Sequence, residues 1–193
     1  MTQDPWVLAL TGSMLSGKST ALDFFRENGA SVLSADAVVG QLYQQEYVRQ
    51  KLKKLLGTAD KKEIAKIVFQ DENERQQLEQ SLHPLVLKHI RSFIKQAQTG
   101  LVVLEIPLLF EAGWDNLFDL VIVVASDPQT LPSRLANRGF TPEEYESRIS
   151  HQWPEEKKIQ AADLVLFHKN KIDLKTKINR LCQTLACLRK VRS

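Results

Sequence analysis

Short, continuous apolar runs alternate along this chain with longer stretches in which apolar residues recur at helical spacing. The short runs are typical of buried strands, and they occupy residues 6–11, 30–35, 101–106, 120–125 and 164–167. A helical pattern over residues 20–28 lies between the first two runs. Strand, helix and strand in this order imply a right-handed crossover between parallel strands. The pattern therefore predicts an α/β fold, a doubly wound five-stranded parallel sheet.

Residues 38–98 form the longest helical block of the chain and contain no candidate strand. Apolar residues recur there at the spacing of amphipathic helices. We expect residues 57–60 to separate two of these helices, and Pro84 to kink or restart the long helix that follows. The block therefore predicts a helical subdomain inserted into the sheet domain.

Local signals mark several helix ends. Gly29 stands where a C-terminal cap is expected, just after the first helical segment. Thr141, Pro142 and Glu144 form a typical helix start, with a capping residue, a proline in the first turn and a glutamate three residues on. A closing helix should cover residues 172–188, after the last strand.

Composition places the chain among folded proteins. It has 193 residues, of which 43% are hydrophobic and 25% charged, which suits one domain with an insertion. No apolar run is long enough to span a bilayer, and residues 1–5 lack the features of a signal peptide. We therefore expect a cytoplasmic protein without a membrane partner, either a monomer or a weak homo-oligomer.

The charge is unevenly spread, although the net charge is only +3. Residues 168–193 carry +7 and the remainder of the chain carries −4. A basic tail can bind nucleic acid, but no aromatic residue follows Phe167 to stack on bases. We interpret this segment as a solvated final helix and expect no nucleic-acid partner.

A glycine-rich loop between the first strand and the first helix carries the clearest chemical signal. It reads G-x-x-x-x-G-K-S, followed by threonine, and comprises Gly12, Ser13, Met14, Leu15, Ser16, Gly17, Lys18, Ser19 and Thr20. The backbone N–H groups of such a loop, with the N-terminus of the next helix, bind a phosphate chain. Lys18 would reach the outer phosphates, and Ser19 would offer its hydroxyl to Mg²⁺. The loop therefore predicts a nucleoside triphosphate site.

Two interpretations of Asp36 remain open from the residues alone. Asp36 closes the second predicted strand, and its carboxylate faces the triphosphate if that strand neighbours the first. There it could accept a proton from an attacking hydroxyl or hold magnesium through water. It would serve equally well as the N-cap of a helix that starts at Ala37.

Arg134 and Arg138 lie four residues apart on one face of a helix expected after the fourth strand. Guanidinium groups on a mobile segment can close over a phosphoryl group and balance its charge. Two such arginines are usually solvated, but the phosphate-binding loop favours the functional interpretation.

His83 precedes Pro84 in the helical block. A lone histidine is more often structural than catalytic, and this one has either a structural role or contact with a substrate.

Residues 170–173 read N-K-I-D, which matches the guanine-reading N-K-x-D pattern of GTP-hydrolysing switches. Such switches also need D-x-x-G to sense the third phosphate. No Asp in this chain has Gly three residues later. We therefore interpret the match as a coincidence, formed by a turn and a helix cap.

The ordered motifs resemble those of the dephospho-coenzyme A kinase family, over nearly the whole chain. They are T-G-S-M-L-S-G-K-S-T at residues 11–20, Ser34-Ala35-Asp36, His83-Pro84-Leu85-Val86, Pro107-Leu108-Leu109-Phe110-Glu111, Arg134 with Arg138, Gln152, and Ala162-Asp163. The phosphate-binding loop alone is widespread. Its combination with H-P-L, P-L-L-F-E and the two arginines is far more specific.

The resemblance implies that ATP phosphorylates the 3′-hydroxyl of dephospho-coenzyme A, giving coenzyme A and ADP, in the last step of coenzyme A synthesis. It implies a nucleotide-binding core at residues 1–37, 99–133 and 161–193, a coenzyme A-binding helical insertion at 38–98 and a lid at 134–160. By motif match, Asp36 is the base, Lys18 the phosphate clamp, Ser19 the Mg²⁺ ligand and Arg138 the leading lid arginine, while Asp36, His83 and Arg134 contact the substrate.

Several positions depart from the family pattern. Ser13 and Leu15 replace loop glycines, Ser34 replaces an acidic residue, Gly40 and Lys61 stand where arginines are usual, and His168 replaces an asparagine. Leucine fits position 15 if its backbone angles are ordinary. These departures keep two alternatives open, a phosphate-loop kinase acting on another nucleoside or nucleotide, and a non-catalytic nucleotide-binding switch.

Overall fold

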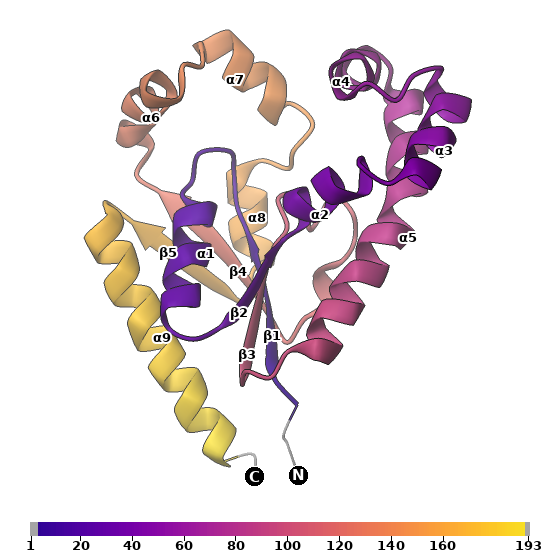
Figure 1. Ribbon diagram of the computed structural model, residues 1–193. Coiled ribbons are helices and arrows are strands. Elements are labelled where there is room, and N and C mark those ends of the chain that lie inside the picture. Colours follow the sequence, from indigo (N-terminus) through magenta and orange to yellow (C-terminus); the bar gives the residue numbers. More distant parts are fainter. Residues whose placement is uncertain (1–3, 192–193) are drawn as a thin grey trace. The chain divides into compact units, whose positions relative to one another are not determined.

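The computed structural model describes residues 4–191 and contains one five-stranded sheet (Figure 1). Its strands are β1 (Trp6–Thr11), β2 (Ser31–Ser34), β3 (Leu101–Glu105), β4 (Leu120–Ser126) and β5 (Leu164–His168). They lie in the order β2-β3-β1-β4-β5, in which β1 pairs in parallel with β3 and β4, and β4 pairs in parallel with β5. The predicted doubly wound α/β fold is confirmed, and the strand that leads into the loop is central.

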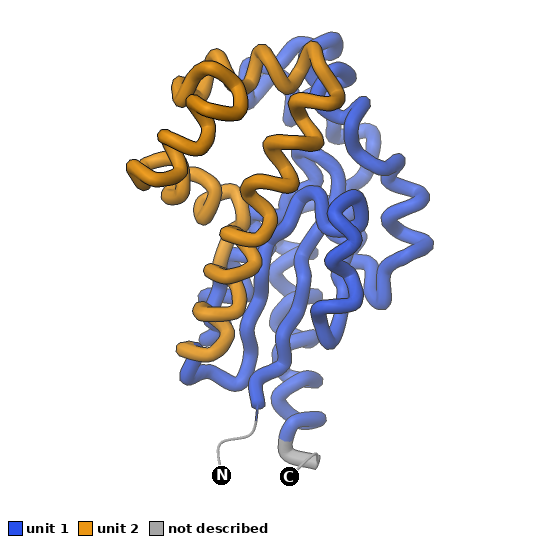
Figure 2. The backbone as a smooth tube through the Cα atoms, turned by 90° about the vertical axis from the view of Figure 1, so that its right-hand side faces the viewer, with its two compact units in different colours: residues 1–32, 97–193 blue, residues 33–96 orange. Residues whose placement is uncertain are grey.

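The chain divides into two compact units, which Figure 2 colours separately. The sheet unit comprises residues up to 32 and from 97 on, and the helical unit comprises residues 33–96. Residues 1–3 of the N-terminal segment considered above, and residues 192–193 of the basic segment, lie outside the described residues. In the described part of the chain, no helix is both long and apolar enough to cross a membrane.

An apolar core joins the sheet to helices α1 (Lys18–Glu27) and α9 (Lys171–Val191), which pack against each other. Its buried members include Leu8, Leu10, Ala21, Phe25, Val103, Ile122, Val124, Leu166, Leu174 and Ile178. Burying one large apolar side chain stabilises a fold by about 1.5–3 kcal/mol. The core therefore fixes the end of β1 and the start of α1, which are the two ends of the glycine-rich loop.

The sheet unit contains three further α-helices and two short 3₁₀ turns in its described residues. These are η1 (Asp115–Leu117), η2 (Pro128–Thr130), α6 (Leu131–Arg138), α7 (Pro142–Ile149) and α8 (Glu155–Ala161). The helix start predicted at Thr141 is confirmed as a capping box. Thr141 Oγ1 accepts a hydrogen bond from the Glu144 N–H at 3.2 Å, and Glu144 Oε2 accepts one from the Thr141 N–H at 3.0 Å.

The helical unit consists of four helices in which α2, α3 and α4 each pack against α5. They are α2 (Ala35–Leu42), α3 (Glu46–Leu56), α4 (Lys61–Gln70) and α5 (Glu72–Gln96). The break predicted at residues 57–60 is confirmed, because Gly57 ends α3 with φ of +75° and Asp60 caps α4. Pro84 lies inside α5, which continues across it, so the long helix does not restart there.

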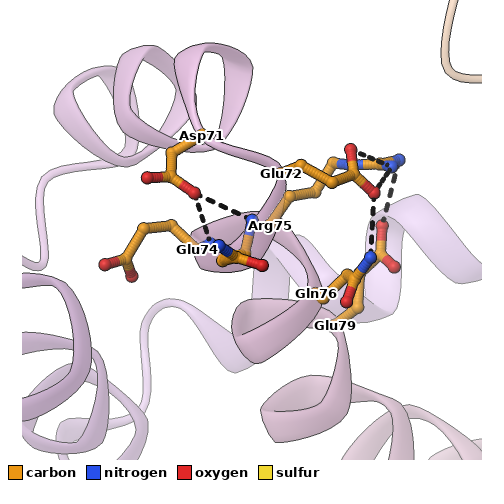
Figure 3. Close-up of polar contacts among 7 residues, drawn as sticks. Asp71, Glu72, Glu74, Arg75, Gln76 and Glu79 are labelled. Atoms are coloured by element: carbon orange, nitrogen blue, oxygen red, sulfur yellow. Dashed lines mark hydrogen bonds and ion pairs between the residues drawn. The ribbon is translucent and has the colours of Figure 1, made fainter.

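Local charges define where α5 begins (Figure 3). Asp71 follows α4, and its Oδ1 accepts a hydrogen bond from the Glu74 N–H at 3.2 Å. Arg75 pairs with Glu72 on one side, and its Nη1 lies 3.7 Å from Glu79 Oε1 on the other. Each such pair contributes only about 0.3–0.5 kcal/mol. The cluster therefore sets the helix start without adding much to stability.

Candidate active site

The loop between β1 and α1 depends on glycine at two positions. Gly12 has φ of +140° and Gly17 has φ of +101°, angles that residues with side chains rarely adopt. A Cβ atom at Gly12 would lie 2.4 Å from the Val124 carbonyl oxygen, and one at Gly17 would lie 2.9 Å from His168 Nε2. These glycines let the loop pass close to β4 and to the end of β5, at the carboxyl edge of the sheet.

Lys18, the predicted phosphate clamp, is held against the loop. It is the first residue of α1, and its side chain is largely buried. Lys18 Nζ donates hydrogen bonds to the carbonyl oxygens of Gly12 at 2.9 Å and Ser13 at 2.8 Å. A buried ammonium group needs such partners, because its charge is costly to remove from water. The contacts place the positive charge of Lys18 beside the loop backbone.

Two more side chains bind loop carbonyls from distant elements. Arg134 Nη1, on α6, donates to the Leu15 carbonyl oxygen at 2.8 Å. His168 Nε2, buried at the end of β5, donates to the Ser16 carbonyl oxygen at 2.8 Å. Because a carbonyl only accepts hydrogen bonds, we assign the ring hydrogen to Nε2. Both contacts tie the loop to elements far from it in the sequence.

Leu15 adopts a left-handed backbone conformation with φ of +64°, the only residue other than glycine with positive φ in the described chain. The condition of ordinary backbone angles at this position is therefore not met. A side chain in this region costs about 1–2 kcal/mol relative to the right-handed region. The bond from Arg134 to the Leu15 carbonyl stabilises the loop in this strained shape.

A cavity of about 570 Å³ joins the loop to the predicted lid arginines. Its lining includes Gly17, Lys18, Ser19, Thr20, Arg134, Arg138, His168, Asn170 and Lys171. Four of the side chains that line it are cations, and none is a carboxylate. A concave surface lined by one sign of charge concentrates ligands of the opposite sign. The geometry therefore brings Lys18, Arg134 and Arg138 around one site suited to phosphates.

A second cavity of about 570 Å³ lies against the other part of the loop. It is lined by Ser13, Met14, Ser16, Tyr145, Trp153 and Glu155, among others. Burial raises the pKa of the Glu155 carboxyl above its usual value, while a hydrogen bond from Ser13 and the charges of Lys158 and Lys18 partly counteract this. The loop is therefore flanked by cations in one cavity and by the carboxyl groups of Glu146, Glu155 and Glu156 in the other.

Glu105 is a further candidate site residue, which the apolar pattern of the sequence places only within a strand. It ends β3, lies opposite Leu10 in the parallel pairing and is 7% exposed. Its Oε1 accepts a hydrogen bond from Ser19 Oγ at 3.1 Å. One sequence feature could have identified Glu105 as a candidate. It is a carboxylate at the end of an apolar strand, and that strand lies beside β1, the strand that leads into the loop. The pair supplies a hydroxyl and a carboxylate, both oxygen ligands of the kind that Mg²⁺ prefers.

Two predicted site residues, Asp36 and His83, belong to the helical unit. Asp36 is the exposed second residue of α2, and Ser34 occupies the N-cap position. Of the two interpretations left open for Asp36, the one in which it caps a helix starting at Ala37 is therefore wrong. A carboxylate in the first helical turn is stabilised by the helix dipole and stays open to solvent. In α5, burial lowers the pKa of His83, which the Glu79 carboxylate partly counteracts.

Comparison with known protein families decides the assignment. The family model described as dephospho-CoA kinase matches residues 6–173, most of this chain. The chain belongs to the dephospho-CoA kinase family. A dephospho-CoA kinase from Symbiobacterium thermophilum is 37% identical over 180 residues, covering 86% of this chain and 75% of the relative.

Solved structures support the fold of this family member. A protein from Thermus thermophilus superposes with a TM-score of 0.85 at 30% identity, covering 94% of this chain and 98% of the other. The dephospho-CoA kinase from Campylobacter jejuni gives a TM-score of 0.65 at 23% identity, covering 92% and 95% of the two chains. At that lower identity, the second comparison supports the fold alone.

The P-L-L-F-E motif of this dephospho-CoA kinase family member contacts the segment after α7. Lys158 is fully buried, and its Nζ lies 3.0 Å from Glu111 Oε1. The same carboxylate oxygen accepts a hydrogen bond from the Trp153 N–H at 2.7 Å. The Trp153 ring stacks on Phe110, with ring centroids 5.5 Å apart. This Glu111–Lys158 anchor fixes the C-terminal end of the predicted lid to the sheet unit.

The N-K-I-D match has a local structural role in this family member. Asn170 Oδ1 accepts a hydrogen bond from the Asp173 N–H at 3.0 Å, at the start of α9. Asp173 Oδ2 in turn accepts bonds from the Lys169 N–H at 3.2 Å and from Lys177 Nζ at 2.9 Å. The interpretation of this segment as a turn and helix cap is confirmed.

Proposed function

We propose that this protein transfers the γ-phosphoryl group of ATP to the 3′-hydroxyl of dephospho-coenzyme A, giving coenzyme A and ADP. Membership of the dephospho-CoA kinase family over residues 6–173 carries the proposal. The cationic cavity beside the glycine-rich loop supports it, because phosphoryl transfer depends mainly on positioning and charge neutralisation.

We assign ATP to the sheet unit and the acceptor to the helical unit. The loop would hold the phosphates through its N–H groups, and the flexible stem of Lys18 would let its ammonium group turn to the outer phosphates. Arg138, with Arg134, would balance the charge of the phosphoryl group in transfer. Residues 134–160 would act as a lid that excludes water. The Glu111–Lys158 anchor supports that role, because it provides a fixed end for a moving segment.

Mg²⁺ fits the donors present at the loop. Ser19 and Glu105 offer a hydroxyl and a carboxylate in hydrogen-bond contact, and Mg²⁺ is usually held by one or two such groups together with substrate phosphates. Within residues 4–191, no three His, Cys, Asp or Glu side chains gather as a separate metal cluster. When bound, the ion would neutralise charge on the phosphate oxygens.

Asp36 is the proposed base. As the ribose 3′-oxygen attacks the γ-phosphorus, its proton would pass to the Asp36 carboxylate. The bond between the γ-phosphorus and the bridging oxygen breaks, and ADP leaves with the electron pair. The exposure of Asp36 at the start of α2 supports this role, since the carboxylate must reach a bound hydroxyl.

The test is coenzyme A formation from ATP, Mg²⁺ and dephospho-coenzyme A, followed by mass spectrometry. We expect turnover by the unaltered protein and a fall in kcat of about 10²–10⁴-fold in Asp36→Asn, the range that general-base catalysis contributes.

Asp23→Asn is the matched control, because Asp23 is an exposed α1 carboxylate paired with Arg26 on the helix surface. It should retain full turnover. No coenzyme A from the unaltered protein would overturn the proposed function. Full turnover in Asp36→Asn would overturn only the assignment of the base.

A further inference from the structure

His168 contacts the glycine-rich loop from the end of β5, where the sheet holds it in place. It lies opposite Ser126 in the parallel pairing of β4 and β5, and it is only 3% exposed. A Cβ atom at Gly17 would lie 2.9 Å from His168 Nε2 and 3.3 Å from His168 Cε1. The imidazole ring therefore packs directly against the Gly17 backbone and has little room to turn away from the loop.

The hydrogen bonding of this ring is directed to the loop. His168 Nε2 donates to the Ser16 carbonyl oxygen at 2.8 Å, whereas Nδ1 is buried and has no hydrogen-bond partner among the described residues. A buried polar atom without a partner is unfavourable, and its presence in a folded protein needs a reason. The contact between Nε2 and the loop provides one.

The bond to Ser16 also fixes the direction of the next N–H group. The Ser16 carbonyl and the Gly17 N–H belong to one peptide unit, and they point in opposite directions when that unit is trans. No cis peptide bond occurs in the described chain. The bond from His168 therefore turns the Gly17 N–H away from the ring. Within residues 4–191 that N–H forms no hydrogen bond, so it can donate to a phosphate oxygen.

His168 differs from the two other side chains that bind loop carbonyls, Lys18 and Arg134. The proposed function assigns both of these cations to phosphate groups, so bound ATP would draw them away from the carbonyl oxygens. The ring of His168 belongs to a central layer of the fold and is packed against the loop. It can keep its carbonyl contact while the phosphates are bound.

We propose that His168 is a positioning residue, which directs the Gly17 N–H to the phosphates of ATP by binding the Ser16 carbonyl. The inference rests on the proposed function only where that function assigns ATP to the loop. An asparagine, the residue usual in the family at position 168, would place its amide nitrogen where the imidazole has Nδ1. From the same backbone it would not reach Ser16. The contact is therefore specific to the histidine of this chain.

The test measures the dissociation constants of ATP and of inorganic triphosphate, each with Mg²⁺, by calorimetry. Inorganic triphosphate has the phosphates of ATP but no base and no ribose. We expect His168→Asn to raise both constants by the same factor, about 3- to 10-fold, the range of one hydrogen bond. His168→Gln should recover most of the affinity, because its amide nitrogen lies as many bonds from the backbone as Nε2 does.

His89→Asn is the matched control. His89 Nδ1 also lies 2.9 Å from a backbone carbonyl oxygen, that of Leu85, but in α5 of the helical unit. This variant should bind both ligands as tightly as the unaltered protein does.

Three results would overturn the role of His168 and leave the proposed function intact. They are unchanged binding of both ligands in His168→Asn, a loss of affinity for ATP alone, which would place His168 at the base, and an equal loss in His168→Asn and His168→Gln. No binding of either ligand by the unaltered protein would overturn both the proposed function and this inference.

Amide signals of the ¹⁵N-labelled protein report on the Gly17 N–H directly. Saturating inorganic triphosphate should shift the Gly17 signal strongly in the unaltered protein and in His168→Gln, and much less in His168→Asn. The signal of Gly57, at the end of α3 in the helical unit, should not shift in any of them. Gly17 shifts of equal size in all three proteins would show that His168 does not direct this N–H, and the proposal would fail.

Steady-state kinetics separates positioning from a loss of folded protein. We expect His168→Asn to raise KM for ATP and to leave both kcat and KM for dephospho-coenzyme A nearly unchanged, because the lost contact holds ATP equally before and during transfer. A smaller folded fraction would instead lower the apparent kcat at an unchanged KM for ATP. That result would assign His168 to stability alone and overturn the proposal.

Discussion

The lysines of the sheet unit and those of the helical unit are held in different ways. Lys18 and Lys158 are buried and donate to backbone carbonyl oxygens, those of Gly12 and Ser13 for Lys18 and that of Pro107 for Lys158. Lys53 and Lys61, in contrast, are exposed. Burial makes a cation part of the local structure, whereas exposure leaves it available to a ligand.

Removing the charge of a buried lysine and removing that of an exposed lysine should have different effects. Loss of a buried lysine leaves its carbonyl or carboxylate partners without a donor, so folding or catalysis should suffer whatever the acceptor. Loss of an exposed lysine should matter only for a ligand that reaches it. The following substitutions test that division, from the largest expected effect to the smallest.

Lys18→Met should have the largest effect of the lysine substitutions on turnover. Methionine keeps much of the apolar stem but removes the charge that serves the phosphates and the loop carbonyls. We expect kcat to fall about 10²–10³-fold, as when one preorganised charge-stabilising donor is removed. Steady-state kinetics, with circular dichroism to verify folding, would measure it. Lys175→Met, on the surface of α9 and paired with Glu27, is the control and should keep full activity. A Lys18→Met enzyme with full kcat would contradict the assignment.

Lys158→Met should act on stability. The substitution leaves Glu111 without the buried ammonium group that compensates its charge. Breaking a buried ion pair in this way costs about 3–5 kcal/mol in the free energy of unfolding. Urea denaturation would measure the loss.

The double variant Glu111→Gln/Lys158→Met distinguishes a buried pair from loss of packing. Because it removes both charges, it should recover part of the lost stability. An unfolding free energy that stays the same in Lys158→Met, or no recovery in the double variant, would show that the pair does not hold the anchor.

Features set by neighbouring residues could be predicted from the sequence. The apolar runs located all five strands, and Gly29, with φ of +83°, follows α1 as expected for a C-terminal cap. The capping box at Thr141 is contained within four residues. The interpretation of Asp36 as the N-cap of a helix from Ala37 was wrong, because Ser34 caps that helix two residues earlier.

Features made by distant residues could not be predicted in the same way. Glu105 meets Ser19 across 86 positions, and Arg134 meets Leu15 across 119. These contacts exist only once the sheet has brought the elements together. The left-handed angles of Leu15 are set by the closed loop, against the preference of a leucine. Arg134 and Leu15 could therefore each be identified in the sequence, but the contact between them could not.

Glu155→Gln should have the smallest effect, on a carboxyl group that the charges of both Lys158 and Lys18 reach. Burial raises the pKa of Glu155 in the folded protein, so the folded state favours the neutral carboxyl. The stability that the neutral form provides is complete below the unfolded-state pKa of about 4.3 and is lost as the pH rises through the folded-state pKa.

Glutamine is neutral at every pH and can still accept the Ser13 hydrogen bond. We therefore expect Glu155→Gln to raise Tm slightly at neutral pH and to leave it unchanged near pH 4, by calorimetry at both values. The exposed Glu156 also raises the pKa of Glu155 through its charge, so Glu156→Gln should raise Tm at neutral pH in the same direction but by less. A lower Tm for Glu155→Gln at neutral pH would mean that attraction to Lys158 and Lys18 outweighs burial, and that the buried lysines need this carboxylate as a counter-charge.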